Sequence, residues 1–209
     1  MSLLPIFLKL ASRRVVVVGA GNIALDKIQS LLQSEALVEV IAPEALPEIQ
    51  ALAAAGKVTW HRGEFDPANL HGAFLIIAAT NTPAVNHAVY SAAVERGILC
   101  NAVDDPPNCD FYFSSVVRRG DLQIAISTAG ESPALAQRLR REIDEQLPED
   151  LGPWLAAVGD IRREVLADYP AGESRKLLLH QLARRDACGS ATCPSRQSAF
   201  APEHTAVSR

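Results

Sequence analysis

The apolar residues of this chain fall into short blocks separated by longer stretches with helical character. Five blocks are rich in β-branched or continuous apolar residues, which is typical of strands: 14–18, 38–42, 58–60, 74–80 and 98–103. Three of the intervening stretches predict helices, at residues 22–33, 44–55 and 83–96. This alternation over residues 13–104 predicts an α/β fold built on a parallel, doubly wound sheet. The block at 74–80 is apolar on both faces, as expected where helices cover both sides of the sheet.

The pattern changes after Asp104. The segment 105–108 (Asp-Pro-Pro-Asn) breaks regular structure, and two β-like stretches follow at residues 111–117 and 122–127. The residues between them, 118–121 (Arg-Arg-Gly-Asp), predict a turn. We therefore expect a small antiparallel element here, outside the parallel sheet.

The rest of the chain is predominantly helical. Ser132 is a favourable N-cap and Pro133 a favourable first residue for a helix that extends to residue 146. Further helices are predicted within residues 151–186. From Cys188 onward Ser, Thr, Pro and Ala dominate without periodicity, which predicts a disordered tail.

The composition is that of an ordinary globular protein. The 209 residues are 48% hydrophobic and 21% charged, with a net charge of −4. This charge indicates neither nucleic acid nor an anionic membrane as a partner. No apolar stretch approaches the ~20 residues of a membrane span, and no signal peptide is evident at the N-terminus. We expect a cytoplasmic protein.

The four cysteines suggest no clear metal site. Cys100, Cys109, Cys188 and Cys193 are most simply four reduced thiols in a reducing compartment. The alternative is a zinc site formed by the pair Cys188 and Cys193 with the flanking His180 and His204.

The most specific local motif is a glycine turn between the first strand and the first helix. It reads Gly-x-Gly-x-x-Ala, with Gly19, Gly21 and Ala24 at the small positions. In a dinucleotide-binding turn the first glycine permits the tight turn, the second allows the pyrophosphate to approach, and the third small residue lets the helix pack closely. The helix amides, beginning at Asn22 and Ile23, would face the negative charge.

Two other strand ends are candidate cofactor contacts. Pro43 and Glu44 follow the second strand, with no Arg or Lys nearby in the sequence to accept a 2′-phosphate, so Glu44 favours NAD over NADP. The alternative is that Pro43 and Glu44 begin the second helix. Thr80 and Asn81 follow the fourth strand, where open α/β sheets bind ligands, although Asn81 could instead cap the next helix.

Asp104 is the candidate catalytic residue. It ends the fifth strand after Val103, which we count among the cofactor contacts, on the same edge of the predicted sheet. A carboxylate close to the expected position of a nicotinamide could act as a general base or as a ligand to an approaching metal. An ordinary turn before Pro106 would also contain aspartate at this position.

A second candidate region could bind anions. Gly130 lies at a helix start whose free amides could hold a carboxylate. Arginine suits carboxylates through its two-pronged geometry, and five arginines cluster in this part of the sequence: Arg118, Arg119, Arg138, Arg140 and Arg141. The alternative is a solvated surface, with Arg141 and Glu145 paired one helical turn apart.

Residues 3–185 together resemble the precorrin-2 dehydrogenase/sirohydrochlorin ferrochelatase family, the N-terminal half of bifunctional siroheme synthases. The glycine loop is common to many families. The ordered combination is far more specific, above all Asn-x-Val-Asp followed by Ser-Thr-x-Gly-x-Ser-Pro. The segments that carry the likeness are 4–10, 18–24, 41–44, 77–81, 100–104 and 126–133.

The resemblance implies an NAD-binding Rossmann domain (1–112), a small α+β dimerisation segment (113–147) and a helical domain (148–187), ahead of the tail (188–209). It implies a homodimer that oxidises the tetrapyrrole precorrin-2 to sirohydrochlorin with NAD⁺. Some members also insert Fe²⁺. The family's essential aspartate matches Asp104, and a position thought to face the tetrapyrrole is Thr128. For insertion of Fe²⁺ or Co²⁺, His61 and His87 are further candidates beside Asp104, although no cluster with metal-ligand spacing is present.

Two competing functions remain. The first is a non-enzymatic NAD-sensing regulatory module, like the NAD-binding domains of potassium transporters. Such sensors usually carry an acid directly at the end of the second strand, where this chain has Ala42 and Pro43, and they have no obvious use for residues 105–147. The second is a dehydrogenase for an unrelated small acid, which the lack of an evident His–Asp or Tyr-x-x-x-Lys pair disfavours.

Overall fold

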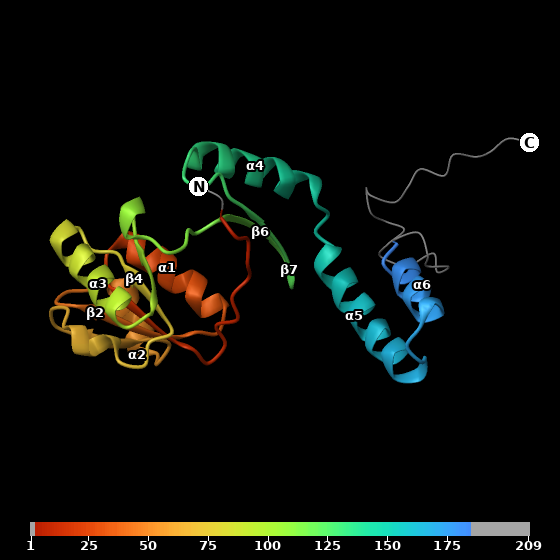
Figure 1. Cartoon of the computed structure of the whole chain (residues 1–209), viewed down its shortest axis with the longest axis horizontal. Coiled ribbons are helices and arrows are strands. Elements are labelled where there is room, and N and C mark those ends of the chain that lie inside the picture. Colours follow the sequence, from red (N-terminus) through yellow and green to blue (C-terminus); the bar gives the residue numbers. More distant parts are fainter. Residues whose placement is uncertain (1–2, 185–209) are drawn as a thin grey trace, which may run out of the picture. The chain divides into compact units, whose positions relative to one another are not determined.

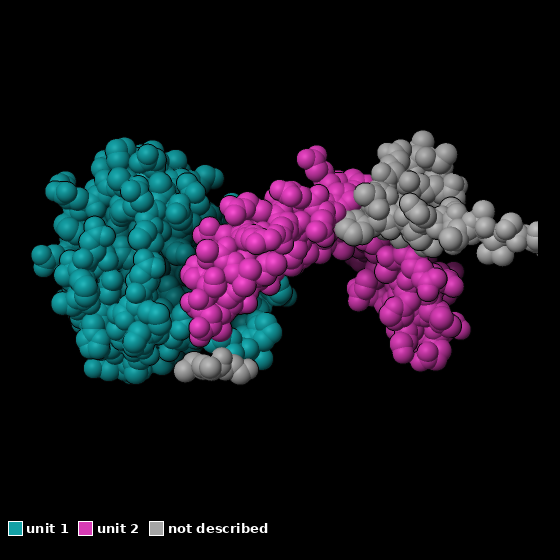
Figure 2. Space-filling model, turned by 90° about the horizontal axis from the view of Figure 1, so that it is seen from above, with its two compact units in different colours: residues 1–113 teal, residues 114–209 magenta. Residues whose placement is uncertain are grey.

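The computed structural model of the chain describes residues 3–184. It forms two compact units, Met1–Phe113 and Ser114–Arg209 (Figures 1 and 2). The disordered tail predicted from Cys188 lies outside the described residues, and so do three of the four ligands of the alternative zinc site. No helix within residues 3–184 is long and apolar enough to cross a membrane.

The first unit is built on a five-stranded sheet in the order β3-β2-β1-β4-β5, with every neighbouring pair parallel. The order reverses on either side of β1, as in a doubly wound Rossmann sheet, so the predicted fold class is confirmed. The strands are β1 (Arg14–Val18), β2 (Leu37–Ala42), β3 (Thr59–Arg62), β4 (Leu75–Ala78) and β5 (Leu99–Ala102).

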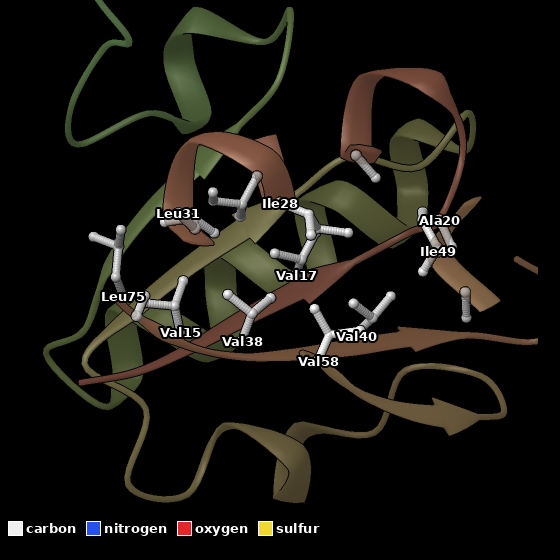
Figure 3. Close-up of a cluster of buried hydrophobic side chains, with 14 of the residues drawn as sticks. Val15, Val17, Ala20, Ile28, Leu31, Val38, Val40, Ile49, Val58 and Leu75 are labelled. Carbon is white, nitrogen blue, oxygen red and sulfur yellow. The ribbon is translucent and has the colours of Figure 1, made fainter. Parts of the chain in front are cut away.

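Alternate residues of each strand point to opposite faces of the sheet, and both faces are apolar. Three helices cover these two faces. The first face packs against α1 (Asn22–Gln33) and α2 (Pro47–Ala54), where Val15 and Val17 share a buried cluster with Ile28 and Leu31 of α1 (Figure 3). The other face, with Val16 and Val18, packs against α3 (Pro83–Glu95). The continuous apolar run at β4 is therefore buried on both sides, as predicted.

The boundaries of several elements differ from the predicted ones. The second helix begins at Pro47, with Glu48 in its first turn, and not at residue 44. Two short 3₁₀ helices, η1 (Pro67–Leu70) and η2 (Pro106–Asn108), were not predicted. Both begin with proline, whose fixed φ suits a first helical position and whose missing N–H needs no partner there.

The second unit begins with an antiparallel hairpin of β6 (Ser115–Arg119) and β7 (Leu122–Ile126). The predicted turn over 118–121 is wrong by two residues, because Arg118 and Arg119 pair within β6 and only Gly120 and Asp121 form the loop. Gly120 has φ +57, and glycine at the first position of a two-residue loop matches the twist of a hairpin.

Three helices complete the second unit: α4 (Pro133–Gln146), α5 (Leu151–Asp168) and α6 (Glu173–Leu182). Ser132 caps α4 as predicted, since its hydroxyl accepts a 3.2 Å hydrogen bond from the Leu135 amide, and Pro133 is the first helical residue. Gly152 of α5 lies so close to Gly120 of the hairpin loop that a Cβ would be 3.0 Å from the loop backbone. The hairpin and α5 therefore pack through two glycines.

Candidate functional site

A cavity of about 790 Å³ opens at the carboxyl ends of β1, β2 and β4. This is the position at which open α/β sheets bind ligands, next to the reversal of strand order. Six of the predicted cofactor contacts line it: Gly19, Gly21, Pro43, Glu44, Thr80 and Asn81. The other three, Asn22, Ile23 and Val103, are not among its lining residues. The fold thus brings together chain segments more than 50 residues apart around one hollow.

The two glycines of the turn have different surroundings. A Cβ on Gly19 would be 2.3 Å from the carbonyl oxygen of Ala79, and Gly19 has φ +109, so only glycine fits. A Cβ on Gly21 would meet nothing within 4 Å. Gly21 is also the N-cap of α1, and no side chain caps this helix. Open space beside uncapped helix amides fits a pyrophosphate, as the sequence motif requires.

Two carboxylates line the cavity at the ends of β2 and β3. Glu44 lines the cavity, and so does Glu64, which sequence reasoning missed because it follows the short strand β3. Pro43 and Glu44 lie in a loop, so the alternative that they begin α2 is wrong. The fold also brings a cation to this edge, since the Nε of Arg62 donates a 3.3 Å hydrogen bond to the carbonyl of Pro43. Arg62 is distant from Pro43 in the sequence, but the folded sheet places the two side by side.

At the end of β4, Thr80 is fixed by the buried side chain of Asn86. The Thr80 hydroxyl donates to Asn86 Oδ1 at 2.7 Å, and Asn86 Nδ2 donates to the Thr80 carbonyl at 3.1 Å. Sequence reasoning missed Asn86, because the fourth residue of a helix has no sequence feature that indicates contact with a strand end. The N-cap of α3 is Thr82, so the alternative in which Asn81 caps this helix is wrong and Asn81 instead lines the cavity.

Asp104 lies just after β5, in a backbone conformation that is uncommon for its type. Its φ is +60, a left-handed value that aspartate tolerates better than most residues, and its side chain is exposed. It does not line the 790 Å³ cavity. A carboxylate presented to solvent in this way can accept a proton or an N–H donor from a bound molecule.

The loop that carries Asp104 is braced against β5. The thiol of Cys109 donates to the carbonyls of Ala102 at 3.0 Å and Asp105 at 3.3 Å. The buried Asn101 donates from Nδ2 to the carbonyl of Phe111 at 2.7 Å. Burial raises the pKa of the Cys109 thiol, which keeps it a neutral donor. Asp104 is therefore held on a fixed support, which a catalytic group needs.

The predicted substrate contacts lie in the second unit. Arg118 is exposed on β6. Arg119 has a structural role, because its guanidinium donates to the Asp144 carboxylate at 2.7 Å and to the carbonyls of Asp144 and Leu147 at 2.7 and 3.0 Å. It thereby binds the C-terminal end of α4, where carbonyls lack helical partners. Arg138 and Arg140 pair with Glu142 and Asp144 on the same helix.

The predicted free amides near Gly130 are largely occupied. The Thr128 hydroxyl accepts a 3.2 Å hydrogen bond from the Ser132 amide, and the Thr128 carbonyl accepts one from the Glu131 amide. Gly130 has φ +87 and Ala129 has φ +53, which gives this loop its tight path. The expectation of an anion site formed by several free amides therefore needs correction, because the loop and the Ser132 cap already use most of them.

Within residues 3–184 no group of three His, Cys, Asp or Glu side chains could hold a metal ion. His61, one of the candidates for metal insertion, bonds to Glu39 at 2.8 Å, and the other, His87, is exposed on α3. Burial raises the pKa of the Cys100 thiol to about 12, so without a metal ion this side chain is a neutral thiol within the core.

Comparison with known proteins identifies both parts of the chain. Residues 6–115 match a family described as putative NAD(P)-binding, and residues 119–146 match the sirohaem biosynthesis protein central family. A solved structure of SirC, a precorrin-2 dehydrogenase, superposes with a TM-score of 0.78 over 93% of this chain and 96% of that chain, at 26% identity.

Siroheme synthases are similar in sequence over most of this chain. That of Photorhabdus laumondii is 43% identical over 165 residues, which cover 79% of this chain and 35% of the relative. Siroheme synthase 1 of Aeromonas salmonicida is 38% identical over 191 residues, which cover 91% of this chain and 41% of the relative. The chain thus spans about two fifths or less of the length of these relatives. It belongs to the siroheme synthase N-terminal family, an NAD(P)-binding domain followed by a sirohaem biosynthesis central segment, with a precorrin-2 dehydrogenase-like fold.

Proposed function

We propose that this chain oxidises precorrin-2 to sirohydrochlorin with NAD⁺. The observation that carries the proposal is the cavity at the glycine turn, lined by Gly21 and Asn81, on the sheet edge where β5 also ends in the braced Asp104. The match to SirC, a precorrin-2 dehydrogenase, over nearly the whole length of both chains supports the same substrate class.

The residues present fit a dinucleotide. The uncapped first turn of α1 and the open space at Gly21 would hold the pyrophosphate, and Thr80 and Asn81 would line the nicotinamide half of the cavity. When bound, NAD⁺ supplies a hydride acceptor. Asn86 keeps Thr80 in place, so the wall of the cavity at β4 is rigid before the cofactor binds.

Asp104 is proposed to take the proton. Oxidation breaks a C–H bond of precorrin-2, whose electron pair leaves as hydride, and an adjacent N–H or C–H then loses a proton to form the new double bond. A carboxylate on a fixed support can accept that proton. Arg118, Thr128 and the single amide of Gly130 are proposed to bind carboxylates of the substrate. Arg119 is not among the proposed contacts, because its guanidinium binds the end of α4.

We further propose NAD rather than NADP as the cofactor. Glu44 and Glu64 both line the cavity beyond β2, where the adenosine ribose would lie, and a 2′-phosphate there would meet two carboxylates. Arg62 works against this preference, since it lies beside Pro43. The measurement is kcat/KM with each cofactor: we expect NAD⁺ to be favoured by about tenfold or more, a free-energy difference of about 1.4 kcal/mol. Equal values would contradict the proposal.

The function itself is tested by anaerobic incubation with precorrin-2 and NAD⁺. We expect one NADH and one sirohydrochlorin for each precorrin-2 consumed. An NAD-sensing module would bind NAD⁺ and form no NADH, and that result would overturn the proposal. A parallel incubation of sirohydrochlorin with ferrous or cobaltous ion tests whether the chain also inserts a metal, a step in which Asp104 would take the pyrrole protons.

A further inference from the structure

Helix α1 and the segment after β5 share one face of the parallel sheet. Ala24 and Ile28 of α1 belong to the same buried cluster as Val15 and Val17, and the partly buried Val103 and Phe111 pack against that cluster. Lys27 lies between Ala24 and Ile28 in the sequence of α1, but its side chain is only half-buried. It therefore lies at the outer margin of this contact.

The ammonium of Lys27 is held at a defined position. Its Nζ lies 4.0 Å from the centroid of the Phe113 ring, close enough for a cation–π interaction. Phe113 in turn meets Phe111 edge to face, with ring centroids 5.6 Å apart and an interplanar angle of 62°. Because Phe111 packs on the core, the aromatic pair fixes the platform on which the ammonium rests.

The charges around this ammonium are acidic. Burial is the largest influence on Lys27 and lowers its pKa, while the carboxylates of Asp26 and Asp104 lie near enough to raise it. Within the described part of the chain, no group accepts a hydrogen bond from Lys27. A half-buried ammonium whose N–H groups have no acceptor in the described protein is available to a bound carboxylate.

We propose that Lys27 is a substrate-binding residue, whose ammonium, resting on Phe113 within electrostatic range of Asp104, binds one carboxylate of the tetrapyrrole polycarboxylate. The inference rests on the proposed function, because that function supplies the class of substrate. Lys27 would add a fixed contact from the Rossmann unit, on the same unit as the proposed proton acceptor. The bound carboxylate would place the adjoining ring against Asp104.

The test compares Lys27→Met, which keeps the length and removes the charge, with Lys27→Arg, which keeps the charge. Lys57→Met, at an exposed lysine of the same unit, is the matched control. With saturating NAD⁺, we expect Lys27→Met to raise KM for precorrin-2 by about tenfold or more, with kcat within about threefold. Lys27→Arg should restore most of the affinity, and Lys57→Met should behave as the parent chain.

A purely structural role for Lys27 would give a different result. In that case Lys27→Met would lower the melting temperature and the affinity for NAD⁺ together. A joint loss of melting temperature and NAD⁺ affinity in Lys27→Met would overturn the inference. So would an unchanged KM for precorrin-2, or a loss confined to kcat.

Equilibrium titration separates this inference from the proposed function. If the parent chain forms no NADH, the proposed function fails, but weaker binding of sirohydrochlorin by Lys27→Met than by Lys57→Met would still support Lys27 as a tetrapyrrole contact. If both variants bind sirohydrochlorin equally, or the parent chain binds none, the inference about Lys27 is overturned.

Discussion

Gly19 and Gly21 are two residues apart in one turn, but the fold constrains them for different reasons. Gly19 faces the backbone of Ala79 and has a positive φ, so its hydrogen is required for the chain to fold. Gly21 faces open space with φ −89, a value that any residue adopts, so its hydrogen leaves room for a ligand. Within this one motif, Gly19 is therefore needed for the fold and Gly21 for ligand binding.

This difference predicts opposite phenotypes for two alanine variants. Gly19→Ala should destabilise the chain by about 3 kcal/mol or more, because a Cβ would overlap the Ala79 carbonyl in a strained conformation. Gly21→Ala should fold normally and bind NAD⁺ about tenfold more weakly, because its Cβ would point into the cavity. Thermal denaturation and NAD⁺ titration measure the two effects. A stable Gly19→Ala, or full NAD⁺ affinity in Gly21→Ala, would contradict this account.

The strands of the first unit are also joined by an ion-pair network. Arg14 of β1 binds both carboxylate oxygens of Glu39 on β2, at 2.7 and 2.8 Å, and Glu39 also contacts His61 of β3 at 2.8 Å. Arg14 further donates to the carbonyls of Asn69 and His71. The hydrogen bond from Arg14 is the main reason that the pKa of Glu39 is lowered, ahead of the opposing effect of burial.

Glu39→Gln should therefore cost about 1–2 kcal/mol of unfolding free energy at neutral pH. The pKa of Glu39 is lower in the folded chain than in the unfolded chain, so its contribution is complete above the unfolded value of about 4.3. This contribution to stability is lost as the pH falls from the unfolded-state pKa through the lower pKa of the folded chain. Urea denaturation across this range should show the parent and variant converging in acid. A constant difference at every pH would contradict the prediction.

At the hairpin, two adjacent arginines should behave differently. Arg119→Ala should lower stability by about 2–3 kcal/mol, because it removes the donors that satisfy the Asp144 carboxylate and two carbonyls at the end of α4. Arg118→Ala, on the exposed side of the same strand, should stay within about 0.5 kcal/mol of the parent chain. Chemical denaturation of the two variants makes the comparison, and equal effects would show that the α4 contacts contribute little.

The elements that the sequence predicted well are those with a strong local cause. The alternating strands and helices of residues 14–102 and the Ser132 cap follow from periodicity and capping, and both are confirmed. Arg119 was misplaced in a turn because its role depends on α4, which is about 25 residues away in the chain. Arg62, Glu64 and Asn86 were missed for the same reason, since only the folded sheet brings them to the cavity or to Thr80.

At the scale of the whole molecule, the resemblance-based expectation of a homodimer remains a prediction. It is supported by the hairpin β6–β7, which forms a sheet of only two strands within the described residues. Isolated two-stranded sheets are marginal and their edges invite pairing. Sedimentation equilibrium at micromolar concentration should give twice the chain mass of 22.4 kDa. A mass of one chain at every concentration would contradict the prediction.

The proposed function requires that the glycine turn holds NAD⁺ so that the nicotinamide reaches the carboxylate after β5. The most direct measurement is a crystal structure of the chain with NAD⁺ bound. We expect the pyrophosphate at the amides beside Gly21, the adenosine ribose near Glu44, and the nicotinamide ring next to Asp104. A cofactor bound in the reverse direction, an empty cavity, or an Asp104 carboxylate turned away from the ring would contradict it.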